Sequence, residues 1–197
     1  RDRFLGIMTG EAERMNRLVG DLLSLSRVES DERVRPTDKV DLRYVLQSTL
    51  RNLNPLADEA NVTLVLLMGD DPMPLLGDTD QLLQVFTNLI ENAIKYGGKG
   101  KKVEIQVEQT LRDPSLRGPA VQVTVRDHGP GIDPIHLPRL TERFYRADSH
   151  RSRALGGTGL GLAIVKHILN RHRGRLKISS SLGQGAQFIV ILPMDMT

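Results

Sequence analysis

The sequence contains no cysteine, which excludes disulfide bonds, thiol nucleophiles and cysteine-based zinc sites. It also lacks an apolar run long enough to cross a bilayer, and its start does not have the pattern of a signal peptide. A net charge of +3 is too small to indicate binding to nucleic acid. Because the first residue is Arg1 rather than methionine, we expect a fragment or a processed chain, from which an upstream anchor could have been lost.

The 197 residues are enough for one domain with a sizeable core and an appendage. Residues 1 to about 30 have the pattern of one helix, in which Met8, Met15 and Leu22 recur every seven residues. A helix with such an apolar stripe needs partner helices, which favours a bundle or a dimer. The alternative is a helix that folds back on the main domain.

Residues 31–39 are polar, charged and interrupted by Pro36, and they are predicted to be a linker before a domain at 40–197. Helix and strand patterns then mix without regular βαβ alternation. This favours an α/β protein of the α+β two-layer sandwich type, with helices on one face of a mixed β-sheet. The predicted helices span 42–60, 78–97 and 160–172, the strands lie near 62–68, 103–107, 121–125, 176–178 and 188–192, a turn covers 70–74, and 128–158 is irregular.

Three segments have the residue types of a nucleotide site. Asn88, Asn92, Lys95 and Tyr96 fall at i, i+4, i+7 and i+8, on one stripe of a helix. Amide oxygens suit a Mg²⁺ ion that also holds phosphate oxygens, and a lysine neutralises phosphate charge. The alternative for this stripe is a solvated helix face.

The second segment, Asp127 to Ile132, places a carboxylate after a predicted strand and before Gly129 and Gly131. A carboxylate only accepts hydrogen bonds, so it suits the exocyclic amine of adenine and not the carbonyl of guanine. Glycines at these positions would let a ligand approach the backbone closely. The alternative is an ordinary Asp-Gly turn.

The third segment, Gly157 to Leu162, opens a predicted helix with unpaired N–H groups that favour phosphate. It is neither a P-loop nor a Rossmann fingerprint, because the required spacing of glycine and lysine is missing. A further pair, Gly183 and Gly185, is predicted to form a tight turn between two strands.

In this order the segments resemble the conserved boxes of sensor histidine kinases, and most closely those of phosphate-regulon sensor kinases. The resemblance covers about residues 40–193 and implies the Bergerat-type ATP-binding fold that gyrase, chaperone and mismatch-repair ATPases share. Asn88–Tyr96 is similar to the N box, Asp127–Ile132 to the G1 box, Phe144–Arg146 to the F box, Gly157–Leu162 to the G2 box and Gly183–Phe188 to the last glycine box.

The resemblance implies a kinase that binds ATP and Mg²⁺. Asn92 would hold Mg²⁺ with Asn88 alongside, and Asn88 and Lys95 would act in catalysis. Residues 133–157 would form a mobile lid whose Arg146, Arg151 or Arg153 could meet phosphate. The residues implied in nucleotide binding are Asn88, Asn92, Lys95, Tyr96, Asp127, Gly129, Gly131, Ile132, Phe144, Arg146, Gly157, Thr158, Gly159, Leu160, Gly161 and Leu162.

The helix at 1–30 resembles the second helix of the family's dimerisation and phosphotransfer domain. The resemblance therefore implies a homodimer through a helical bundle and a response-regulator receiver domain as partner. It also implies the cytoplasmic domain of a sensor anchored in the inner membrane through upstream segments. No nucleic-acid partner is expected.

The chain also departs from the family pattern. None of its five histidines matches the phosphoacceptor, so we expect ATP binding without autophosphorylation at the usual site. His128 replaces an asparagine, and His136 and His150 fall in the lid. His167 and His172 are predicted at surface positions on the last helix.

The related ATPases have a water-activating glutamate where this chain has Asn88, so slow hydrolysis is expected. Glu91 lies off the ligand stripe and is predicted to be a surface charge. An anti-sigma-factor-type serine kinase with the same ATP fold is the alternative function, but the helix at 1–30 and its linker argue against it. A non-catalytic nucleotide sensor is a further alternative, against which the intact Asn92, Lys95 and Asp127 argue.

Overall fold

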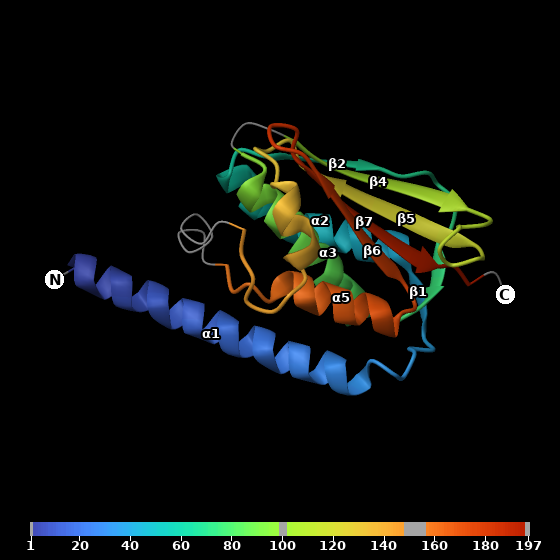
Figure 1. Ribbon diagram of the computed structural model, residues 1–197, viewed down its shortest axis with the longest axis horizontal. Coiled ribbons are helices and arrows are strands. Elements are labelled where there is room, and N and C mark those ends of the chain that lie inside the picture. Colours follow the sequence, from blue (N-terminus) through green and yellow to red (C-terminus); the bar gives the residue numbers. More distant parts are fainter. Residues whose placement is uncertain (1, 99–101, 148–156, 196–197) are drawn as a thin grey trace.

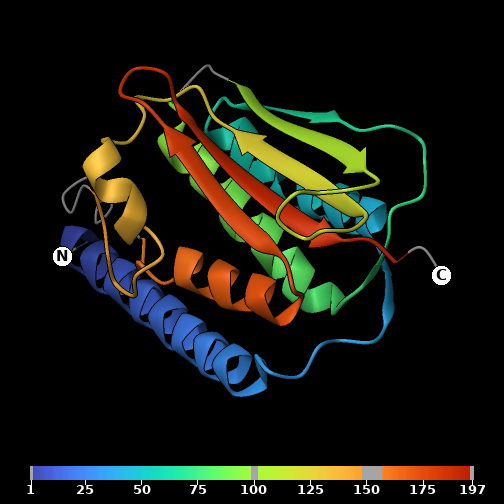
Figure 2. The same ribbon diagram turned by 45° about the vertical axis from the view of Figure 1, so that its right-hand side comes forward.

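The computed structural model describes residues 2–98, 102–147 and 157–195 (Figure 1). A five-stranded mixed sheet forms one layer, and the helices lie on one of its faces (Figure 2). The elements are α1 (Asp2–Asp31), β1 (Lys39–Asp41), α2 (Leu42–Glu59), β2 (Thr63–Leu67), β3 (Pro74–Leu76), α3 (Thr79–Tyr96), β4 (Lys102–Thr110), β5 (Ala120–Arg126), the 3₁₀ helix η1 (Pro134–Arg139), α5 (Gly161–Arg171), β6 (Arg175–Ser180) and β7 (Ala186–Pro193).

The main sheet has the strand order β2-β4-β5-β7-β6, in which only the β2–β4 pair is parallel. Alternating apolar residues of its strands face the helices, so that Ile105 lies opposite Val125, and Val125 lies opposite Phe188. These three side chains are buried against α3 and its neighbours. The predicted two-layer arrangement with helices on one face of a mixed sheet is confirmed.

A second, two-stranded sheet was not predicted. In it, β1 pairs antiparallel with β3, with Val40 opposite Leu75 and both side chains buried. The predicted linker 31–39 therefore ends one residue inside a strand, and the predicted turn 70–74 ends on the first residue of another. Strands of three residues are too short to show alternation, which is why the sequence pattern did not reveal them.

Helix α1 runs along α5 on the side away from the sheet (Figures 1 and 2). Near its carboxyl end, Leu25 and Val28 are buried in the domain core, and Ser24 hydrogen-bonds the side chain of Gln84. The stripe that includes Met8 and Met15 stays exposed. The end of the helix thus folds back on the domain, while its first half keeps an apolar face. Among the described residues, none of the helices combines the length and apolar character needed to cross a bilayer.

His172 was predicted at the surface, but it is 1% exposed at the end of α5. Its Nδ1–H donates to the Ile168 carbonyl (2.8 Å), and its Nε2 accepts from the Asp78 backbone N–H (3.0 Å). Burial lowers the pKa of His172 from its usual value of 6.5, opposed by the hydrogen bond to Ile168. The nearby charges of Arg171 and Arg35 lower this pKa further, and that of Asp78 raises it. The ring therefore stays neutral and joins α5 to the start of α3.

This burial predicts an acid-sensitive contribution to stability. Because the pKa of His172 is lower in the folded state, its contribution is fully present above pH 6.5 and is lost as pH falls through the folded-state pKa. A His172→Gln variant keeps an acceptor for the Asp78 N–H but does not titrate. Urea unfolding over the range from about pH 7.5 to about pH 5.5 should show a smaller loss of stability in the variant than in the wild type. Equal pH slopes would contradict this assignment.

Candidate functional site

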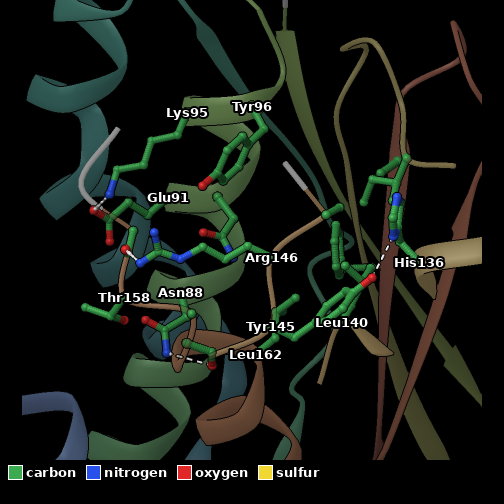
Figure 3. A pocket seen from close by; sticks show the side chains of 18 of the residues that line it. Asn88, Glu91, Lys95, Tyr96, His136, Leu140, Tyr145, Arg146, Thr158 and Leu162 are labelled. Atoms are coloured by element: carbon green, nitrogen blue, oxygen red, sulfur yellow. Dashed lines mark hydrogen bonds and ion pairs between the residues drawn. The ribbon is translucent and has the colours of Figure 1, made fainter. Parts of the chain in front are cut away.

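A cavity of about 640 Å³ opens between α3, the start of α5, the segment around η1 and one side of α1 (Figure 3). A volume of this size is typical of small-molecule sites. Its lining comes from five separate parts of the sequence: α1, α3, residues 127–147, residues 157–162 and the start of β7. Of the sixteen residues predicted to bind nucleotide, thirteen line it: Asn88, Asn92, Lys95, Tyr96, Asp127, Gly131, Ile132, Arg146, Gly157, Thr158, Gly159, Gly161 and Leu162.

Helix α3 supplies one wall of the cavity. It begins at its cap residue Asp78, whose carboxylate accepts from the Gln81 N–H. Its opposite face, which includes Leu89 and Ile90, is fully buried against the core and fixes the rotation of the helix. Asn88 donates from Nδ2 to the Gly161 carbonyl (3.3 Å), so its side chain also connects α3 to the start of α5.

Glu91 was predicted to be a surface charge off the ligand stripe, and this is wrong. Its side chain is 34% exposed, lines the cavity and accepts a 2.6 Å hydrogen bond from the Lys95 ammonium (Figure 3). Glu91 lies three residues after Asn88 and four before Lys95, and both spacings place side chains on the same side of a helix. The sequence spacing was therefore sufficient to place Glu91 on the same side of the helix as Asn88 and Lys95.

Asp127 follows β5 and is 6% exposed at the inner end of the cavity. Its Oδ1 accepts from the backbone N–H of Gly129 (2.9 Å) and of Ala186 (3.3 Å). These bonds hold the carboxylate in a fixed orientation between two strand ends. A buried acceptor with a fixed direction can select a ligand by the donor that it presents.

The glycines after Asp127 have a structural role that was not predicted. A Cβ atom at Gly129 would lie 2.6 Å from the Tyr96 carbonyl oxygen, and one at Gly131, at φ +76°, would overlap the Ser181 carbonyl. Both glycines let the chain approach its own backbone closely. Gly129 accordingly lies outside the cavity lining, whereas Gly131 remains at its edge.

The glycine-rich segment leads into α5, which begins at Gly161 without a side-chain cap. Gly157, Gly159 and Gly161 line the cavity. Uncapped N–H groups at a helix start favour an anion. Leu160, predicted to bind nucleotide, is instead fully buried in the core, because its side chain points away from the cavity at the first turn of the helix.

Phe144 also lies outside this cavity. The residue is 57% exposed and lines a second groove with Met15 and Leu18 of α1, while its backbone N–H donates to the Gly159 carbonyl (2.8 Å). Arg146 lines both spaces, and its guanidinium donates to the Gly157 carbonyl. The other two predicted lid arginines, Arg151 and Arg153, and His150 lie outside the described residues.

Several cavity residues were missed from the sequence. His136 Nδ1 and the Tyr145 hydroxyl lie 2.6 Å apart, and the Arg139 guanidinium stacks 4.1 Å from the centre of the Tyr145 ring. From α1, Arg17 and Asp21 also line the cavity. The Thr158 hydroxyl donates to Asp21 Oδ2 at 2.5 Å across 137 residues of sequence, and no local pattern signals such a contact.

Two histidines predicted in other roles contact glutamate side chains. His167, expected at a surface position, reaches from α5 to Glu29 of α1 (3.2 Å) and to Glu32 directly after α1 (2.6 Å), and its hydrogen bond lowers the pKa of Glu32. His128 pairs with Glu104 at 2.6 Å, and the pKa of Glu104 is lowered first by Lys102 and then by His128. His167 therefore helps to hold α1 on the domain.

The sequence matches the family described as "Histidine kinase-, DNA gyrase B-, and HSP90-like ATPase" over residues 77–196. It is 40% identical to the phosphate regulon sensor protein PhoR of Pseudomonas aeruginosa over 94% of this chain and 40% of that protein. It is 35% identical to the sensor-like histidine kinase SenX3 of Mycolicibacterium smegmatis over 97% of this chain and 48% of that protein. The chain thus spans about half or less of the length of these relatives.

The fold has solved counterparts. The Acinetobacter baumannii histidine kinase AdeS superposes with a TM-score of 0.75 at 25% identity, over 99% of this chain and 86% of that one. The family match covers more than half of the chain, and it includes the end of β5 with Asp127 and the start of α5. The chain therefore belongs to the histidine kinase-, DNA gyrase B- and HSP90-like ATPases, and its relatives place it with the catalytic domains of sensor histidine kinases.

Proposed function

We propose that this chain binds ATP with Mg²⁺ and, within the intact protein, transfers the γ-phosphate to a histidine that passes it to an aspartate of a response regulator. The observation that carries the proposal is the meeting of Asn88, Asn92, Lys95 and Asp127 around one cavity. These residues come from a helix and a strand end more than thirty positions apart. Their chemistry matches the two ends of an adenine nucleotide.

The side chains present fit Mg²⁺ held together with a nucleotide. Asn88 and Asn92 offer amide oxygens, which are hard ligands. In residues 2–98, 102–147 and 157–195 no group of three or more His, Asp or Glu is placed to hold a metal by itself. Such a site suits an ion that keeps waters and phosphate oxygens as its other ligands, and the ion would supply positive charge against the phosphates.

Asp127 would accept a hydrogen bond from the exocyclic amine of adenine. Its orientation is already fixed by the N–H groups of Gly129 and Ala186, so little ordering is needed on binding. Guanine presents a carbonyl at the equivalent position and would leave two acceptors facing each other. The side chains of Ile132 and Leu140 would provide apolar surface for the base.

The phosphates would lie toward Lys95 and the start of α5, where Gly157, Thr158 and Gly159 line the cavity. The contribution of the chain to phosphoryl transfer would be positioning and charge neutralisation. The accepting histidine would belong to another segment of the intact protein. The exposed stripe of α1 would complete a dimeric helical bundle with that segment, and membrane attachment would also come from other segments.

Calorimetric titration tests the proposal. ATP and ADP should bind in the presence of Mg²⁺ and lose affinity in EDTA, and GTP should bind more weakly than ATP. Asp127→Ala should weaken ATP binding roughly 10- to 100-fold, because a buried hydrogen bond to a charged acceptor is lost. Asp127→Asn tests the same contact with less risk to the fold, and Asp58→Ala on the exposed side of α2 is the matched control. Normal ATP binding by both Asp127 variants would refute the adenine assignment.

The transfer step needs the phosphoacceptor segment. The catalytic chain together with that segment and labelled ATP should give protein-bound phosphate that is lost in acid and stable in base. Acid-stable label on a second protein would instead support a serine kinase.

A further inference from the structure

The two cavity cations on the phosphate side are already engaged by acceptors of the chain itself. The Lys95 ammonium donates to Glu91, and the Arg146 guanidinium donates to the Gly157 carbonyl (Figure 3). The Gly157 carbonyl is neutral, but the Glu91 carboxylate carries a negative charge. A nucleotide that brings phosphate to Lys95 therefore meets a carboxylate already in that place.

The geometry of the Glu91–Lys95 pair is favourable. Glu91 precedes Lys95 by one helical turn, which is the better order for such a pair. The Nζ–Oε1 distance is 2.6 Å, and the two side chains are only 34% and 21% exposed. Partial burial reduces solvent screening, so the pair is worth more than a fully exposed one.

The other charged groups around the cavity do not replace this interaction. Asp21 lies on α1 and accepts from the Thr158 hydroxyl, and Asp127 is held by backbone N–H groups at the inner end. Arg17 and Asp133 complete the charged lining. Among the described residues, Glu91 is the carboxylate that the structure pairs with Lys95.

We propose that Glu91 is a positioning residue that occupies the place of a nucleotide phosphate on Lys95 and competes with the nucleotide for that ammonium. The proposal rests on the proposed function of the cavity. The pair holds the Lys95 ammonium against the Glu91 carboxylate on the cavity side of α3. On binding, the phosphate displaces the Glu91 carboxylate from the Lys95 ammonium, and the loss of this ion pair opposes binding. Glu91 thereby lowers the affinity for ATP and ADP and speeds their release.

The test compares Glu91→Gln with wild type for adenosine, ADP and ATP, each with Mg²⁺, by calorimetry and by stopped-flow release. We expect ADP and ATP to bind about three- to tenfold more tightly to the variant, the range of a partly buried ion pair, and to dissociate more slowly. Adenosine, which has no phosphate, should bind equally to both proteins. Asp80→Asn, an exposed carboxylate on the same helix, makes the same charge change away from the cavity and should alter nothing.

A double-mutant cycle with Lys95→Met separates competition from simple repulsion. In the Lys95→Met background, Glu91→Gln should lose most of its effect. An equal gain in both backgrounds, or unchanged or weaker ATP binding by Glu91→Gln, would overturn the proposal. Failure of the wild-type chain to bind any of the three ligands would refute the nucleotide site itself, so the two failures are distinguishable.

Discussion

Asn92→Ala is expected to remove the magnesium-dependent part of ATP binding. Asn92 lies on the cavity side of α3, one turn after Asn88 and beside the Glu91–Lys95 pair. Loss of an amide oxygen that meets a charged group costs about 1.5–3 kcal/mol, which corresponds to a loss of affinity of roughly 10- to 100-fold. Titration with ATP in Mg²⁺ and in EDTA should therefore give nearly the same weak affinity for the variant and very different affinities for the wild type.

The proposed adenine end of the site provides the internal control. Asp127 is untouched by the substitution, so adenosine should bind the variant as it binds the wild type. Asn52→Ala removes an amide from the exposed side of α2 and should leave every titration unchanged. If Asn92→Ala retained the full difference between Mg²⁺ and EDTA, the metal would have to be held elsewhere.

Side chains of the cavity that the sequence predicted lie within short, continuous segments. The spacing of Asn88, Asn92 and Lys95 along one helix places them on the same side. This periodicity can be recognised in the sequence without the tertiary structure. Asp127 was recognisable because a carboxylate after an alternating strand must lie at the edge of the sheet. The spacing within each segment could not show that the two segments line the same cavity. That expectation came from the family resemblance, which rests on the order of the motifs along the chain.

The misplaced residues share a physical cause. Leu160 and Phe144 lie inside recognised motifs, but one turns into the core and the other toward α1. A motif identifies a stretch of backbone and does not determine the direction of each side chain in it. Gly129 belongs to the same group, since its small size is required by the Tyr96 carbonyl of a different element.

The contacts of α1 with the rest of the domain could not be predicted from local sequence patterns. Asp21 of α1 contacts Thr158, and Glu32, directly after the helix, contacts His167, at separations of more than a hundred residues. The seven-residue period correctly indicated an apolar face, but it could not show that Leu25 and Val28 at one end are buried in the catalytic domain. An amphipathic pattern indicates that the apolar face of a helix packs against another element, but it does not identify that element.

Gly185→Ala is expected to destabilise the domain severely. Gly185 has φ +76°, and a Cβ atom there would overlap the backbone carbonyl of Asp127. The left-handed conformation costs about 1–2 kcal/mol for a residue with a side chain, and a clash with backbone adds about 1–3 kcal/mol. Urea unfolding should therefore show a loss of about 2–5 kcal/mol, a large share of the stability of a domain of this size.

The neighbouring Gly183 makes the test specific, because it has nearly the same backbone conformation (φ +79°) in the same turn but open space around its Cβ position. Gly183→Ala should cost only the conformational part, about 1–2 kcal/mol. The difference between the two variants then measures the close packing of the β6–β7 turn on the Asp127 backbone. Since the Ala186 N–H that follows Gly185 also orients the Asp127 carboxylate, Gly185→Ala should weaken ATP binding in the fraction that still folds, whereas Gly183→Ala should not. Equal losses of stability in both variants would show that strain in the turn, and not contact with Asp127, explains the glycine at 185.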